Sequence, residues 1–166
     1  MARVVRARAQ ARIISQGQSG RRAALERTRS SLDRALDALA DLPADQRADT
    51  ALGYTERQLH FHAGDILVTL GDWQAAHRAF GQADELYAST EVLDRALVGF
   101  GQARCLLAAN EPDQALGLGR DVLTGLPAEH RTAVIMQVAR SFGRDAGRRD
   151  GRLPALAGYR EALHSA

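Results

Sequence analysis

Residues 64–83 read GDILVTLGDWQAAHRAFGQA and carry the pattern that decides the fold. Apolar residues recur three and four positions apart on both sides of the pair Gly71-Asp72, which is the spacing of an amphipathic helix. A glycine can end one helix in a left-handed conformation, and an aspartate can cap the start of the next. The stretch therefore predicts two antiparallel helices joined by a tight turn.

The turn and its surroundings recur along the chain. Counterparts of Gly71-Asp72 stand at Asn110-Glu111 and Asp150-Gly151, 39 and then 40 residues further on. A small residue follows five positions after the start of each turn, as Ala76, Ala115 and Ala155. Residues 37–47, DALADLPADQR, also match residues 121–131, DVLTGLPAEHR, at six of eleven positions. A period near 40 made of helix, turn and helix is typical of an α-solenoid of helical hairpins.

The composition favours the same all-α class. Ala and Leu, both strong helix formers, make up 52 of the 166 residues, while residue types that favour strands are sparse. The periodicity predicts seven helices, at about 20–42, 55–70, 73–88, 91–108, 112–125, 128–146 and 153–164. Residues 20–166 are expected to form one helical repeat domain. Within it, we expect Gly64 and Ala76 to mark close helix contacts, and Leu67 and Phe80 to fill the space between hairpins.

Charge is distributed unevenly. Residues 1–25 carry six Arg and no acid, residues 26–139 carry ten Arg and seventeen acids, and residues 140–166 carry six Arg and three acids. Residues 1–19 are predicted to be a weakly ordered basic leader with three alternative roles: an extension without a specific role, a nonspecific contact with nucleic acid or anionic lipid, or a short helix that closes the solenoid. The acidic middle argues against specific nucleic-acid binding by this chain alone.

One segment resembles a known family. Gly64, Leu67, the Gly71-Asp72 turn, Ala76 and Phe80 are similar to one tetratricopeptide repeat, except that His60 stands where a bulky aromatic residue is usual. The second hairpin keeps Ala103, Leu106, Ala115 and Pro127 but has Gly119 in place of an aromatic residue, and the third keeps Gly143, Ala155, Tyr159 and Ala162. The longer repeat and the segments 54–62 and 126–131 resemble the C-terminal half of actinobacterial helix-turn-helix transcriptional regulators over about residues 20–165. About 20 residues precede the first predicted helix, so we expect the chain to lack the DNA-reading domain of those regulators.

The sequence predicts no catalytic, cofactor-binding or metal-binding residues. His60 and His62 are two positions apart on a predicted helix, so their side chains diverge and cannot share a metal as an i, i+4 pair could. Cys105 lies in an apolar stripe, which indicates a buried, inert thiol. The two G-x-G stretches, residues 99–101 and 117–119, do not follow a strand, which argues against a phosphate-binding loop.

The resemblance to tetratricopeptide repeats implies a concave groove formed by the first helix of each hairpin. Counting around from Gly64 and Ala103 places six residues there: Phe61, Asp65, Val68, Phe100, Arg104 and Leu107. Two aromatic anchors with an acid and a base one turn beyond would suit an extended peptide or a helix. The alternative is that both Phe residues pack between adjacent helices.

We therefore expect a non-enzymatic, cytoplasmic, protein- or peptide-binding regulatory module, in which a partner in the groove shifts the packing of the hairpins. Alternatives are the effector-sensing half of a helix-turn-helix regulator without its DNA-binding head, and an accessory protein that assists a biosynthetic enzyme. A small-molecule effector and a homodimer are further candidates, since the terminal hairpins show no obvious polar cap. No apolar run is long enough to cross a membrane, and the single Cys fits a reducing compartment.

Overall fold

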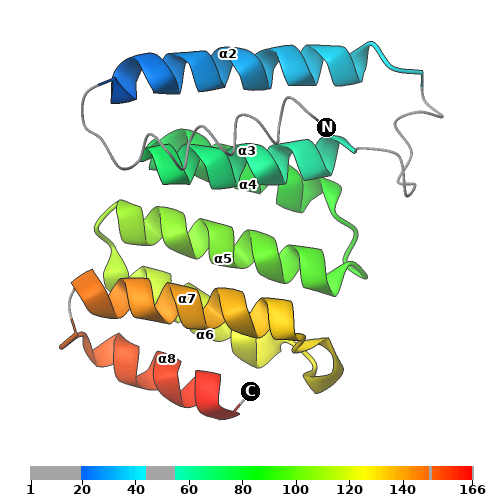
Figure 1. Cartoon of the computed structure of the whole chain (residues 1–166). Coiled ribbons are helices and arrows are strands. Elements are labelled where there is room, and N and C mark those ends of the chain that lie inside the picture. The colour runs from blue at the N-terminus through cyan, green and yellow to red at the C-terminus, as the bar shows by residue number, and fades with distance from the viewer. Residues whose placement is uncertain (1–19, 44–54, 150, 166) are drawn as a thin grey trace. The chain divides into compact units, whose positions relative to one another are not determined.

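The computed structural model describes residues 20–43, 55–149 and 151–165, which form seven α-helices, one 3-10 helix and no strand (Figure 1). The predicted all-α class is therefore confirmed, and the solenoid arrangement stays a prediction. The sequence predicted one domain over residues 20–166, whereas the chain divides into two compact units, Met1–Leu86 and Tyr87–Ala166, called unit 1 and unit 2 below. The leader predicted at residues 1–19 lies outside the described residues.

Unit 1 contains α2 (Arg21–Ala40), α3 (Glu56–Leu70) and α4 (Trp73–Leu86), with α3 and α4 packed as a hairpin and α2 packed against α3. Thr55 begins α3 as predicted: its hydroxyl accepts from the backbone N–H of Gln58, and the Gln58 side chain accepts from the Thr55 N–H at 3.0 Å. This reciprocal capping box satisfies donors that a helix start leaves without partners. The Arg29 guanidinium of α2 donates to the Asp72 carboxylate, which links α2 to the turn between α3 and α4.

The turns at Gly71 and Asn110 have the same geometry. Both residues adopt a left-handed conformation, with φ of 82° and 67°. In each turn the next residue's N–H donates back to a helix carbonyl: Asp72 to Leu67 at 2.9 Å, and Glu111 to Leu106 at 3.0 Å. This pattern is the Schellman motif, which glycine and asparagine favour because they tolerate positive φ. The equivalence of these two turns, inferred from their spacing, is therefore present in the backbone.

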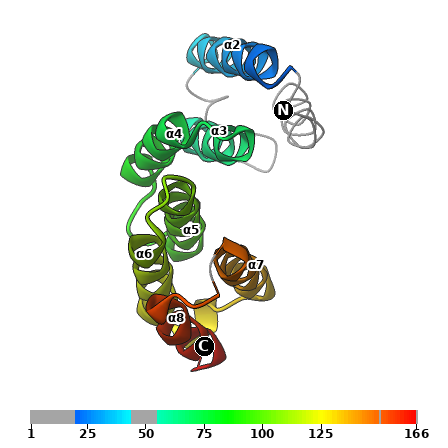
Figure 2. The ribbon, with the colours of Figure 1, turned by 90° about the vertical axis from the view of Figure 1, so that its left-hand side faces the viewer.

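Unit 2 contains α5 (Val92–Ala108), α6 (Pro112–Gly125), the 3-10 helix η2 (Ala128–His130), α7 (Ala133–Arg149) and α8 (Pro154–Ser165). Helices α5 and α6 pack as one hairpin, and α7 and α8 pack together after it. Figure 2 shows α6 and α8 on one side of this unit and α5 and α7 on the other, so the two pairs lie one after the other in two layers.

The predicted helix at 128–146 is wrong at its start. Residues Ala128–His130 form a 3-10 turn, and Arg131 then adopts φ −78° and ψ 59°, which is not helical. The Arg131 side chain holds this bend, because its Nε donates to the Leu126 carbonyl at 3.1 Å. The α-helix begins after Thr132, whose hydroxyl accepts from the Ile135 N–H at 3.4 Å.

Glycines and aromatic rings meet where the helices come closest. A Cβ added at Gly119 would lie 2.8 Å from the Phe142 ring and 3.0 Å from the Tyr159 ring, and one at Gly143 would lie 2.8 Å from Tyr159. Such distances are too short for a real methyl group, so a side chain at either position would force an aromatic ring to move. In unit 1, Gly64 meets Phe80 in the same way. Gly64 is a close contact as predicted, and the Phe80 ring fills space within its own hairpin, while its predicted role between hairpins stays a prediction.

Candidate partner-binding surface

Three of the six predicted groove residues share one face of α3. Phe61, Asp65 and Val68 are spaced four and three positions apart, which aligns their side chains along a helix, and each is partly exposed. The Phe61 ring packs edge-on against Phe80 with centroids 6.0 Å apart, and it also lies 5.3 Å from the His62 ring. Phe61 is therefore an oriented aromatic side chain that still reaches the surface.

Phe100 and Leu107 differ from the prediction. Phe100 is completely buried and Leu107 is 5% exposed, and both belong to the apolar core of unit 2. The Phe100 ring lies 6.1 Å from that of Phe142, which comes from α7. An anchor must be reachable by a partner, so the prediction of Phe100 and Leu107 as groove contacts is wrong. Phe100 instead packs between helices, which was the alternative given for it in the sequence analysis.

Arg104 is partly exposed on α5, next to the buried Cys105. Burial raises the pKa of the Cys105 thiol to about 12, and the positive charge of Arg104 lowers it by a smaller amount. The thiol therefore keeps its proton at neutral pH and is a poor nucleophile. The six predicted residues are divided equally between the two units, with Phe61, Asp65 and Val68 in unit 1 and Phe100, Arg104 and Leu107 in unit 2.

The histidine on α3 and the metal-ligand side-chain types were the remaining candidates for chemistry. His60 is buried on α3, with its Nε2 3.6 Å from the Glu56 carboxylate one turn earlier. Within residues 20–43, 55–149 and 151–165, no group of three His, Cys, Asp or Glu side chains is placed to hold a metal ion. None of the helices in these ranges is both long enough and apolar enough to span a membrane.

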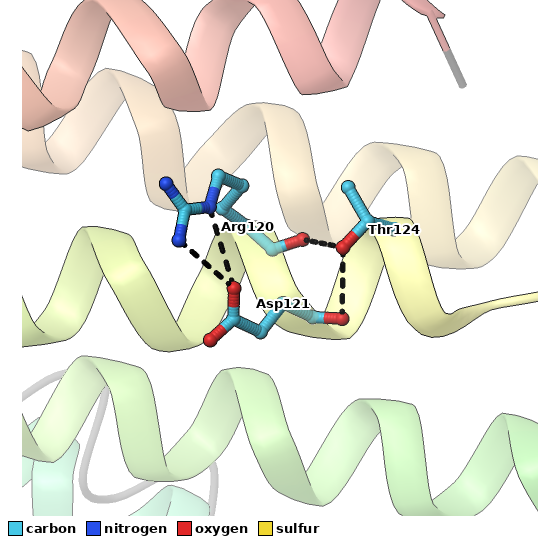
Figure 3. Close-up of polar contacts among 3 residues, drawn as sticks. All are labelled: Arg120, Asp121 and Thr124. Atoms are coloured by element: carbon cyan, nitrogen blue, oxygen red, sulfur yellow. Dashed lines mark hydrogen bonds and ion pairs between the residues drawn. The ribbon is translucent and has the colours of Figure 1, made fainter.

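An exposed polar cluster on α6 is local to its own helix. Arg120 donates from Nε and Nη2 to one carboxylate oxygen of Asp121, at 3.3 and 3.2 Å (Figure 3). The Thr124 hydroxyl donates to the carbonyls of Arg120 and Asp121, at 3.1 and 3.4 Å. Both charged side chains are more than half exposed, and exposed ion pairs of this kind contribute little stability.

A pocket of about 230 Å³ in unit 1 is lined by Leu36, Asp37, Leu39, Ala40 and Glu56. Pockets for small molecules usually measure about 300–1,000 Å³ and are mostly apolar. This pocket is smaller and carries two carboxylates, so it does not support the small-molecule effector, which stays a prediction.

Two rows of like charge lie along helix faces, and the sequence analysis, which considered only the total charge of each segment, did not predict them. Arg140, Arg144 and Arg148 follow one face of α7, and Asp33, Asp37 and Asp41 follow one face of α2 and its C-cap. The four-residue spacing of like charges was the signal that would have revealed both rows.

No family model, curated protein or solved structure matches this chain. The resemblance to tetratricopeptide repeats and to helix-turn-helix regulators therefore stays a prediction. The alternative of an accessory protein for an enzyme also stays a prediction.

Proposed function

We propose that this chain is a non-enzymatic, protein- or peptide-binding regulatory module built from tetratricopeptide-like helical hairpins. The observation that carries the proposal is the face of α3 with Phe61, Asp65 and Val68, all partly exposed on the first helix of a hairpin. An aromatic residue, a carboxylate and an aliphatic residue within two turns supply apolar contact and charge together.

The chemistry of this face suits a particular kind of partner. The negative charge of Asp65 would attract a basic side chain, while Phe61 and Val68 would cover an apolar residue one turn away from it. Because the Phe61 ring already packs against Phe80, its orientation is largely fixed before binding, which reduces the entropy lost when a partner docks. A basic amphipathic helix, or an extended peptide with alternating apolar and basic residues, has these properties.

The hairpins themselves support the tetratricopeptide-like reading. The equivalent turns at Gly71 and Asn110 each join the first helix of a hairpin to the second. In both hairpins a glycine on the first helix faces a side chain on the second helix. Gly64 faces Phe80, and Gly99 faces Val122. The proposal omits Phe100 and Leu107, because those two side chains are buried, and Arg104 is a candidate polar contact of unit 2 by itself.

The test selects peptides that bind the full chain from a random displayed library and measures their affinity by fluorescence anisotropy. We expect the combination of Phe61→Ala and Asp65→Asn to weaken binding by at least about tenfold, since apolar anchors dominate such interfaces. Leu86→Ala is the matched control, because it removes an exposed apolar side chain from α4. Circular dichroism verifies that each variant is folded. Equal binding by the wild type and the Phe61/Asp65 variant would exclude this face as the binding site.

A further inference from the structure

The outward face of α7 carries a row of three arginines. Arg140, Arg144 and Arg148 are exposed, and Arg144 and Arg148 lie on the opposite side of the helix from its buried residues, Ile135, Met136, Ala139, Phe142 and Ala146. Arg148 Nη1 lies 3.2 Å from the Asp145 carboxylate, and both side chains are largely exposed. Within the described part of the chain, Arg140 and Arg144 have no carboxylate partner. Like charges four residues apart repel each other, although Arg148, in the last turn of α7, also interacts favourably with the helix dipole.

A matching acidic row lies on α2. Asp33, Asp37 and the C-cap residue Asp41 are exposed and also spaced by four, and none of their side chains has a cationic partner among the described residues. The last turn of α2 contains no basic residue. Asp37 and Asp41 lie at the negative end of the helix dipole, and neighbouring carboxylates of the row repel each other, so the acidic row lacks a stabilising role within its own helix.

The two rows fit one another in charge and in spacing. Four helical residues rise about 6 Å, so each row places three charges over about 12 Å. An antiparallel pairing would place Asp33 against Arg148, Asp37 against Arg144, and Asp41 against Arg140. Arginine binds carboxylates through paired, charge-assisted hydrogen bonds, which favours this partner over a point charge.

Two exposed apolar side chains favour the antiparallel direction. Leu42, 36% exposed, follows Asp41, and Val134, 61% exposed, lies near the start of α7 and precedes Arg140. Antiparallel pairing brings these two ends together, whereas parallel pairing places them at opposite ends. A polyanion such as nucleic acid would use the arginines but leave Val134 without an apolar contact and meet the negative charge of Asp145.

We propose that a second copy of this chain docks on α7, with the Asp33, Asp37 and Asp41 row of one copy paired with the Arg140, Arg144 and Arg148 row of the other. Each copy presents both rows, so self-association relieves the repulsion among the like charges within each row. The proposal does not depend on the partner-binding face of α3.

Charge reversal tests this pairing in the full chain by analytical ultracentrifugation at about 50 mM salt, where surface charges are weakly screened. Arg140→Glu/Arg144→Glu/Arg148→Glu and Asp33→Arg/Asp37→Arg/Asp41→Arg should each weaken self-association by at least about tenfold, because each variant presents two rows of the same sign. An equimolar mixture of the two variants should associate with an affinity close to that of the wild type, because each then meets a row of opposite sign.

Arg22→Glu/Arg27→Glu/Arg78→Glu is the matched control. These arginines are exposed in unit 1, and the substitution changes the net charge by the same amount as reversal of the α7 row. The control should associate like the wild type. A wild type that stays monomeric at about 100 μM under these conditions, where even weak self-association would be detected, would overturn the proposal. A mixture of the two charge-reversal variants that does not associate would also overturn it. The same holds if the α7 variant loses binding to duplex DNA while its self-association is unchanged.

Discussion

Single glycines set how closely the helices of unit 2 approach one another. Gly117 and Gly119 both lie on α6, but only Gly119 faces other side chains, those of Phe142 and Tyr159. Tyr159 is completely buried, and its hydroxyl donates to the Ala139 carbonyl at 2.8 Å. Burial of the ring raises the pKa of Tyr159, so the phenol stays protonated as this donor. A side chain at residue 119 would displace two packed rings.

We predict opposite effects of alanine at these two glycines. Gly119→Ala should destabilise the protein by about 1–3 kcal/mol, because the added methyl overpacks the core. Gly117→Ala should stabilise it by up to about 1 kcal/mol, because no atom lies within 4 Å of the new Cβ and alanine favours helix. The free energy of unfolding in urea, measured for both variants, checks the prediction. Similar values for the two variants would contradict it.

Local signals define the ends of most helices. Thr55 and Gly71 were predicted to bound the helix at 55–70, and they are the N-cap and C-cap of α3. Asp72 was predicted to cap the next helix, and its carboxylate accepts from the Ala75 N–H at 3.3 Å. The prediction failed at residues 128–132, because the Arg131 side chain holds a bend there by a contact that periodicity does not reveal.

We predict that alanine and serine at Thr55 have different effects on stability, because only serine retains the N-cap hydroxyl. Thr55→Ala should lower the free energy of unfolding by about 1 kcal/mol, because the Gln58 N–H loses its acceptor. Thr55→Ser should retain most of the stability, since serine caps as well as threonine does. Urea unfolding, together with hydrogen exchange of the first amides of α3, measures the effect. An alanine variant as stable as the serine variant would show that the capping box is not needed.

The whole molecule contains two compact units, and unit 2 has a core drawn from all four of its α-helices. Its largest buried side chains include Phe100, Phe142 and Tyr159. The ring centroids of Phe100 and Phe142 are 6.1 Å apart, and those of Phe142 and Tyr159 are 5.4 Å apart. A unit with its own contiguous core has what independent folding requires.

We predict that residues 87–166 fold without the rest of the chain. The fragment should show a helical circular dichroism spectrum and one cooperative urea transition. Phe142→Ala in the same fragment should cost about 3–5 kcal/mol and so abolish or strongly weaken that transition, which distinguishes native packing from residual helix. A gradual loss of signal in both fragments would contradict the prediction.

The sequence by itself determined the all-α class, most helix ends and the two equivalent turns. These features depend on residues within a few positions of one another, such as Thr55 with Gln58 or Gly71 with Leu67 and Val68. Tertiary structure alone decided that Phe100 is buried while Phe61 reaches the surface. Phe100 meets Phe142, which lies 42 residues away in the chain, and no local pattern specifies which distant side chain will cover a given helix face.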